Sequence, residues 1–185
     1  MAKIVILFAL TLALNLALKF FVAPRYGKDV AARFLEHLKY IPSQDEALSQ
    51  ASLARWLADK TQSGAISGYV FPVLLFPLDI LFLICLGLFL GFASVPLAER
   101  LELLSSLPSW IWWILPMCYM ASDIAENTVI AAIFKSFVPL SAKSFRLLST
   151  FTTIKIRSVK AAICQVAVLG ALNVLSLVIP FGMPI

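Results

Sequence analysis

Charged residues are scarce in this chain of 185 residues, since they make up 14% of it while hydrophobic residues make up 61%. A soluble globular domain is about half apolar and about a quarter charged. The composition therefore excludes an ordinary soluble domain. The apolar residues also occur in runs of about 20, the length that crosses about 30 Å of hydrocarbon. We predict an all-α integral membrane protein.

Histidine and cysteine are scarce as well. The single histidine, His37, lies outside the apolar runs, which excludes a histidine-rich metal site. Cys85, Cys118 and Cys164 lie inside the runs and form no C-x-x-C pair, so we interpret them as buried free thiols. Neither a D-D-x-x-D nor a D-x-x-x-D array is present to hold Mg²⁺ for a diphosphate substrate. We expect no metal and no cofactor.

Four apolar runs predict a single transmembrane domain over residues 1–185, built as a four-helix bundle. The predicted spans are 4–22, 69–94, 110–134 and 156–179. The first run resembles a signal peptide, but its length and Pro24 after the small residue Ala23 favour an uncleaved helix. Between the first two spans, residues 24–68 predict two short amphipathic helices on the cytoplasmic membrane surface, or a simple connection.

Basic residues are distributed unevenly between the two sides of the predicted bundle. Thirteen fall on the side of the two longer connections, and only Lys3 and Arg100 fall on the other. By the positive-inside rule the longer connections face the cytoplasm and both termini face outward, to the periplasm if this is a bacterial inner-membrane protein. The basic residues flank apolar spans without interleaved aromatics, so we expect anionic lipid headgroups as partners and no nucleic acid.

The predicted third span carries a polar stripe. Asp123, Glu126 and Asn127 stand at i, i+3 and i+4 and project from one helical face, which Tyr119 extends by one turn. A charged group at mid-bilayer costs at least about 2.5–3.5 kcal/mol on insertion scales. Two carboxylates on one face therefore need partners or water.

The second and fourth predicted spans offer such partners. Asp79 lies about 15 Å from the cytoplasmic end of its span, and Glu126 lies about 13–14 Å from the same side, so the carboxylates converge on one level. Lys155 is the best counter-charge for Asp123 or Glu126, and Thr152 precedes it by three residues on the same face. The alternative is that Lys155 lies among lipid phosphates, as Arg157 does.

Three motifs together resemble an uncharacterised family of small four-helix membrane proteins. They are Pro77-Leu-Asp79 after Tyr69, then Asp123-Ile-Ala-Glu-Asn127, and Ser149-Thr-Phe-Thr-Thr-Ile-Lys155. In this order they match an Asp in the second span, a D-x-x-E-N in the third and an F-T-x-x-K opening the fourth. The resemblance covers residues 64–160 and departs at Ile156, where an aromatic residue is usual. It implies the architecture and the residue set, and no activity.

Two functions fit these residues about equally, and a third ranks below them. The first is an intramembrane enzyme that acts on a lipid or isoprenoid substrate from the cytoplasmic leaflet. Asp79, Asp123, Glu126 and Lys155 would be its catalytic groups, because crowded carboxylates at low dielectric can divide into a protonated acid and an ionised base. Substrate contacts would come from the polar residues beside them, namely Tyr119, Asn127, Thr152 and Arg157.

The second function is a structural or assembly subunit of a larger membrane complex, in which the network fixes helix register. The third is proton or ion translocation, although four helices are few for a transporter and no inverted repeat is visible. A matched structural network needs one base for each acid, yet three acids meet one well-placed base. This surplus of acidic residues favours the enzyme over the structural role. It predicts a cavity that opens between the second, third and fourth spans.

Overall fold

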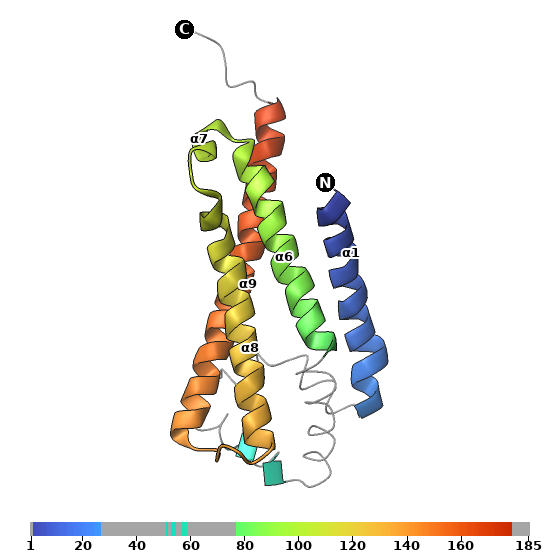
Figure 1. Cartoon of the computed structure of the whole chain (residues 1–185), viewed down its shortest axis with the longest axis vertical. Helices are drawn as coiled ribbons and strands as arrows, with labels where there is room; N and C mark the ends of the chain where they lie inside the picture. Colours follow the sequence, from blue (N-terminus) through green and yellow to red (C-terminus); the bar gives the residue numbers. More distant parts are fainter. Residues whose placement is uncertain (1, 27–50, 52, 55–56, 59–76, 179–185) are drawn as a thin grey trace.

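The computed structural model describes residues 2–26, 51, 53–54, 57–58 and 77–178, and all the regular structure in them is helical. At the N-terminus α1 (Ala2–Ala17) continues into a π-helical turn, η1 (Leu18–Val22), and a 3-10 turn, η2 (Ala23–Tyr26). The remaining elements follow in the order shown in Figure 1. They are α6 (Leu78–Glu99), α7 (Glu102–Ser105), η4 (Ser109–Trp113), α8 (Ile114–Phe134) and α9 (Ala142–Val178).

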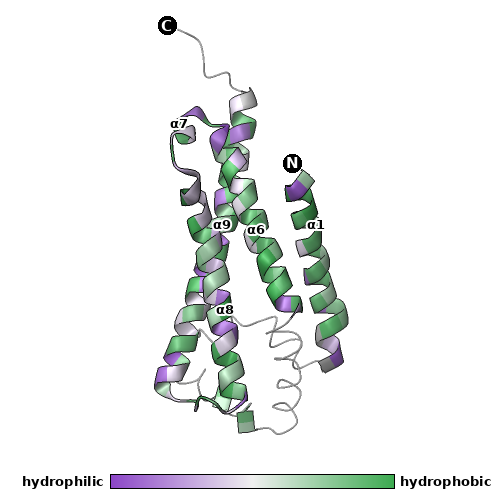
Figure 2. Cartoon of the chain, viewed as in Figure 1, coloured by the Kyte–Doolittle hydropathy of each residue, from purple (hydrophilic) through white to green (hydrophobic). Residues whose placement is uncertain are grey.

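Three of these helical segments are long and apolar enough to cross a membrane: Ala2–Val22, Leu78–Glu99 and Ala142–Ser176. Their outward surfaces carry large apolar side chains, and α1 and α6 are almost wholly hydrophobic (Figure 2). With 21 residues α8 has a comparable length. It falls outside this group because its polar stripe lowers its mean hydropathy. The described part of the chain is thus helical with three candidate spans, and a fourth span stays a prediction.

The bounds of the helices differ from the predicted spans at two points. First, α6 begins at Leu78 directly after Pro77, whereas the predicted span began at residue 69. Proline lacks an N–H and restricts the residue before it, which makes Pro77 a natural place for this helix to start. Second, α9 begins at Ala142, well before the predicted span at 156–179. Buried Phe145 and Leu148 hold this early part against the bundle.

The helices pack in a sequence that places α1 at one edge. The antiparallel pair α8 and α9 contact each other extensively, α6 packs on both, and α1 packs mainly on α6 (Figure 1). The start of α1, the α6–α8 connection and the end of α9 lie toward one end of the bundle, and the α8–α9 connection lies at the other (Figure 1). The central helix α6 therefore contacts all the other long helices.

Two glycines allow α6 to approach α8 and η4 closely. A Cβ atom at Gly87 would overlap the Met120 side chain, and one at Gly91 would overlap the Trp113 ring. The two glycines form a G-x-x-x-G pattern, which is typical of closely packed membrane helices. A larger residue at either position would require the contacting side chain or its helix to shift.

Little of the predicted amphipathic segment 24–68 can be compared with the structure. Of its residues, 24–26 belong to η2, and 51, 53–54 and 57–58 are helical, with Leu53 buried. The rest of the segment, and residues 69–76 of the predicted second span, lie outside the described residues. Two amphipathic helices in this segment stay a prediction.

Candidate functional site

The middle part of the buried face of α8 is polar. Tyr119, Asp123, Glu126 and Asn127 are all buried, while the apolar residues Met117 and Ile124 on the same helix are about half exposed. This is the reverse of a helix in a soluble protein, and it fits a helix that turns its apolar side to lipid. The burial results from packing against α6 and α9, which supply the partners of the polar stripe.

Lys155 of α9 forms ion pairs with two carboxylates of α8. Its Nζ lies 2.6 Å from Asp123 Oδ1 and 2.6 Å from Glu126 Oε2. The contact with Glu126 is also a hydrogen bond, whereas the one with Asp123 has the distance of an ion pair without the geometry of a directed hydrogen bond. Lys155 therefore serves as counter-charge for both predicted candidates.

Thr152, one turn before Lys155, completes the contacts of Glu126. Its hydroxyl donates to Glu126 Oε1 and also lies 3.0 Å from the carbonyl oxygen of Leu148 in its own helix. Both Thr152 and Glu126 are fully buried. The α8–α9 half of the cluster is thus closed, with each oxygen of Glu126 in contact with a donor from α9.

Asp79 joins the cluster from α6 and is its most exposed carboxylate. Asn127 Nδ2 donates to Asp79 Oδ2 at 2.7 Å, which ties α8 to α6. Unlike the buried Asp123 and Glu126, Asp79 is partly exposed. It also lies in the first turn of α6, where the helix dipole favours a negative charge. The α6 half of the cluster is therefore its accessible half.

Two buried acceptor atoms of the cluster lack a hydrogen bond among the described residues. They are Asn127 Oδ1 and Asp123 Oδ1, the latter having only its ion pair with Lys155. A buried polar atom without a partner costs about 1–3 kcal/mol. The described cluster has more acceptors than donors.

The charges show the same surplus. Asp79, Asp123 and Glu126 face one cation among the described residues, Lys155, so three ionised carboxylates would leave a net charge of −2. In a medium of low dielectric such a surplus is costly unless a proton or a ligand offsets it. The surplus of negative charge in the cluster therefore favours binding of a hydrogen-bond donor or a cation.

The other predicted contact residues divide between the cluster and the surface. Tyr119 is buried and interacts with Asp123. Arg157 is exposed and does not join the network. Two residues turn a helix by about 200°, so Arg157 lies on the side of α9 opposite Lys155. The separation of Lys155 and Arg157 by two positions could already have been read from the sequence.

Two further predictions, a cavity beside the carboxylates and the expectation of no metal, can be compared only with the residues that the structure describes. Two hollows of the described residues, an apolar groove between α1, α6 and α9 and a second one beside Trp113, are not lined by Asp79, Asp123, Glu126 or Lys155, and the predicted cavity stays a prediction. The described part of the chain also contains no group of three His, Cys, Asp or Glu side chains that could hold a metal ion. The arrangement of the carboxylates instead follows the ammonium group of Lys155, which lies between two of them.

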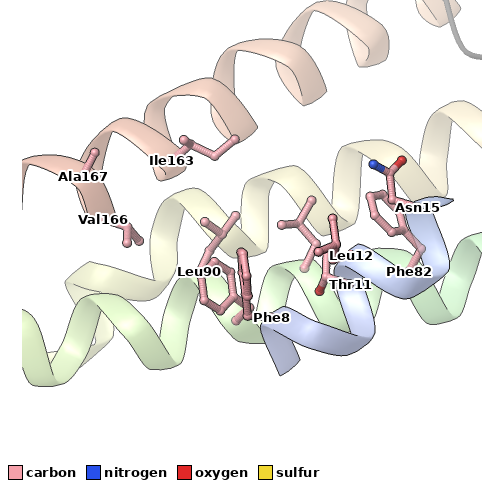
Figure 3. A pocket seen from close by; sticks show the side chains of 11 residues that line it. Phe8, Thr11, Leu12, Asn15, Phe82, Leu90, Ile163, Val166 and Ala167 are labelled. Atoms are coloured by element: carbon pink, nitrogen blue, oxygen red, sulfur yellow. The ribbon is translucent and has the colours of Figure 1, made fainter. Parts of the chain in front are cut away.

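An apolar groove near Asp79 was not predicted. It has a volume of about 460 Å³ and lies between α1, α6 and α9 (Figure 3). Its polar lining residues are Thr11 and Asn15 of α1. A lone asparagine inside the first apolar run was the signal that sequence reasoning could have used, because a polar residue within a membrane span marks a contact or a site.

No protein-family model, curated protein or solved structure matches the chain.

Proposed function

We propose that this chain is a four-span membrane protein that binds a membrane lipid or isoprenoid at the carboxylate cluster and acts on it by acid–base chemistry. The observation that carries the proposal is the difference in burial and in bonding partners among the three carboxylates. Asp123 and Glu126 are buried against Lys155, whereas Asp79 is partly exposed and held by a single amide. Asp79 is therefore the group that a substrate reaches.

In this mechanism Asp79 acts as the general base or acid, and Asn127 positions it through the bond from Nδ2 to Oδ2. Glu126, Asp123 and Lys155 set the electrostatic field around it, with Thr152 fixing Glu126. The positive-inside distribution supports a site open to the cytoplasmic leaflet, in a bacterial inner membrane with both termini outside. The family resemblance supports the same residue set.

A structural or assembly role in a larger membrane complex is the second candidate. The contacts of Glu126 with Thr152 and Lys155 favour it, because they join α8 to α9 and engage both oxygens of the carboxylate. Buried polar contacts of this kind fix helix register in membrane bundles. The partial exposure of Asp79 is not needed for that role, and neither is the Asn127 Oδ1 atom that lacks a donor among the described residues.

The test is a comparison of the wild type with Asp79→Asn in liposomes made from a total lipid extract. Mass spectrometry of the lipids over time should show that the wild type converts one lipid class while the variant, with unchanged circular dichroism, leaves it intact. Identical lipid profiles with both proteins would contradict the enzymatic proposal and favour the structural role.

A further inference from the structure

The groove between α1, α6 and α9 runs along α6 toward Asp79 of the carboxylate cluster. Its wall on α6 runs from Phe82 to Leu90, about 12 Å along the helix axis. Asp79 lies three residues before Phe82, so it projects from nearly the same helical face one turn beyond the groove. A chain lying in the groove would thus end at the accessible carboxylate.

The polarity of the groove changes along its length. At the end toward Asp79, Asn15 of α1 lies beside Phe82, whereas Phe8 and Leu90 form the opposite, apolar end (Figure 3). The Asn15 side chain makes no hydrogen bond within the part of the chain that the structure describes, although it lies inside a candidate span. One polar end and one apolar end are what a lipid with a single headgroup requires.

The volume and position of the groove suit an alkyl chain. Sites for small molecules have volumes of about 300–1,000 Å³ and mostly apolar walls, and this groove meets both conditions. It is lined by residues of α1, α6 and α9, and α1 itself packs mainly on α6. Lipid is the solvent around these candidate spans, so a lipid chain is the occupant at hand.

The headgroup follows from the charges and from the unpartnered acceptor. Three carboxylates against Lys155 leave a surplus of negative charge, and Asn127 Oδ1, in a side chain that is only 3% exposed, lacks a donor among the described residues. Since Lys155 is already engaged by two carboxylates, it is not free to bind an anion. The site needs positive charge and N–H groups.

We propose that the groove holds the hydrocarbon chain of a lipid whose headgroup carries a primary ammonium, and that this ammonium binds at Asp79 beside Asn127. This inference rests on the proposed function and names its substrate class. The ammonium offsets the charge surplus and donates to Asp79, while Asn15 offers an amide to an ester or phosphate oxygen of the same lipid.

The test measures which lipid the protein retains. Purified protein is equilibrated with equal amounts of phosphatidylethanolamine, phosphatidylcholine and phosphatidylglycerol of one chain composition, and native mass spectrometry counts the adducts. Phosphatidylcholine has the same net charge as phosphatidylethanolamine but no N–H donor, and phosphatidylglycerol is anionic. We expect the wild type to prefer phosphatidylethanolamine over both by about tenfold, as a hydrogen bond between charged groups implies.

Three variants assign the two parts of the site. Asp79→Asn should lose the headgroup preference and keep general lipid retention. Ala167→Phe fills the groove from α9 and should reduce all three adducts, whereas Ala171→Phe, one turn further on the same helix and also exposed, should behave as wild type. Circular dichroism checks that each variant is folded.

Equal retention of the three lipids by the wild type, or a preference for phosphatidylglycerol, would overturn the inference. So would a phosphatidylethanolamine preference that survives Asp79→Asn, or equal effects of the two phenylalanines. The proposed function fails separately: retention of phosphatidylethanolamine without any lipid conversion would refute the chemistry and leave the ligand assignment standing. Asp79-dependent conversion of an anionic lipid would support the chemistry and refute the ligand assignment.

Discussion

Two polar layers connect α9 and its neighbours in different ways. In the first, near the α6–α8 connection, Gln165 Nε2 donates to Ser94 Oγ at 2.8 Å and to the Trp112 carbonyl oxygen at 3.1 Å. Asn173 Nδ2 there donates to the carbonyl oxygen of Leu97 at 2.8 Å. This neutral layer joins α9 to α6 and η4 without using any charge. Gln165 and Asn173 thus make contacts between helices.

The carboxylate cluster is the second layer, and it uses charges to bind α8 to α6 and to α9. It joins α6, α8 and α9 with three carboxylates and one lysine, and it leaves Asn127 Oδ1 without a donor among the described residues. Amide, hydroxyl and carbonyl groups hold the neutral layer together. A polar contact between α6 and α9 thus forms without charges, and this difference supports a ligand-binding role for the charged layer.

The largest effect is expected where a charge loses its partner. Lys155→Met leaves Asp123 and Glu126 buried without a counter-charge and should lower the free energy of unfolding by about 3–5 kcal/mol. Unfolding in an SDS titration measures it, with Lys160→Met, at an exposed position of the same helix, as control. Similar stabilities of the two variants would mean that the ion pairs contribute little and that the layers differ less than their charges suggest.

A smaller loss is expected between the two layers, where α6 meets η4. Gly91→Ala places a Cβ atom in the Trp113 ring and should destabilise the protein by about 1–3 kcal/mol. Gly87→Ala is the matched control, because the Met120 side chain that it meets is flexible and can move aside. If Gly87→Ala proves the more harmful of the two, the close approach of η4 does not limit the packing of α6.

In the neutral layer the expected loss is smaller still. Gln165→Leu removes two hydrogen bonds between helices, and such bonds in membrane bundles contribute about 0.6 kcal/mol on average and up to about 1.7. The same SDS titration should thus rank Gln165→Leu well below Lys155→Met. A loss as large as that of Lys155→Met would show that the neutral layer is the main structural bond of the bundle.

The sequence predicted the helices and the cluster for identifiable reasons. Apolar runs located the candidate spans, and the i, i+3, i+4 spacing placed Asp123, Glu126 and Asn127 on one buried face. Such patterns are periodic within one helix and need no tertiary knowledge.

Other features depend on how helices meet and were not predictable in this way. The groove is formed by exposed apolar side chains that resemble any lipid-facing residues in sequence. The pairing of Asn127 with Asp79, and of Lys155 with two carboxylates at once, depends on the distances between α6, α8 and α9. The start of α6 after Pro77 was missed because a proline inside an apolar run can also be tolerated as a kink.

The smallest expected change in stability belongs to Asp79→Asn, and it separates the two layers most directly. The substitution removes one negative charge from a cluster that has a surplus, and the new carboxamide keeps an acceptor for Asn127 Nδ2. The free energy of unfolding should therefore stay within about 0.5 kcal/mol of the wild type or rise. Lipid conversion should nevertheless be lost, because the carboxylate that meets the substrate is gone. A residue that helped only to hold helices together would show the opposite pattern, with a fall of about 1 kcal/mol or more in SDS titration and no specific change in bound lipid. A stable but inactive variant would thus show that the charged layer exceeds what the fold needs, and that this excess is used on a ligand.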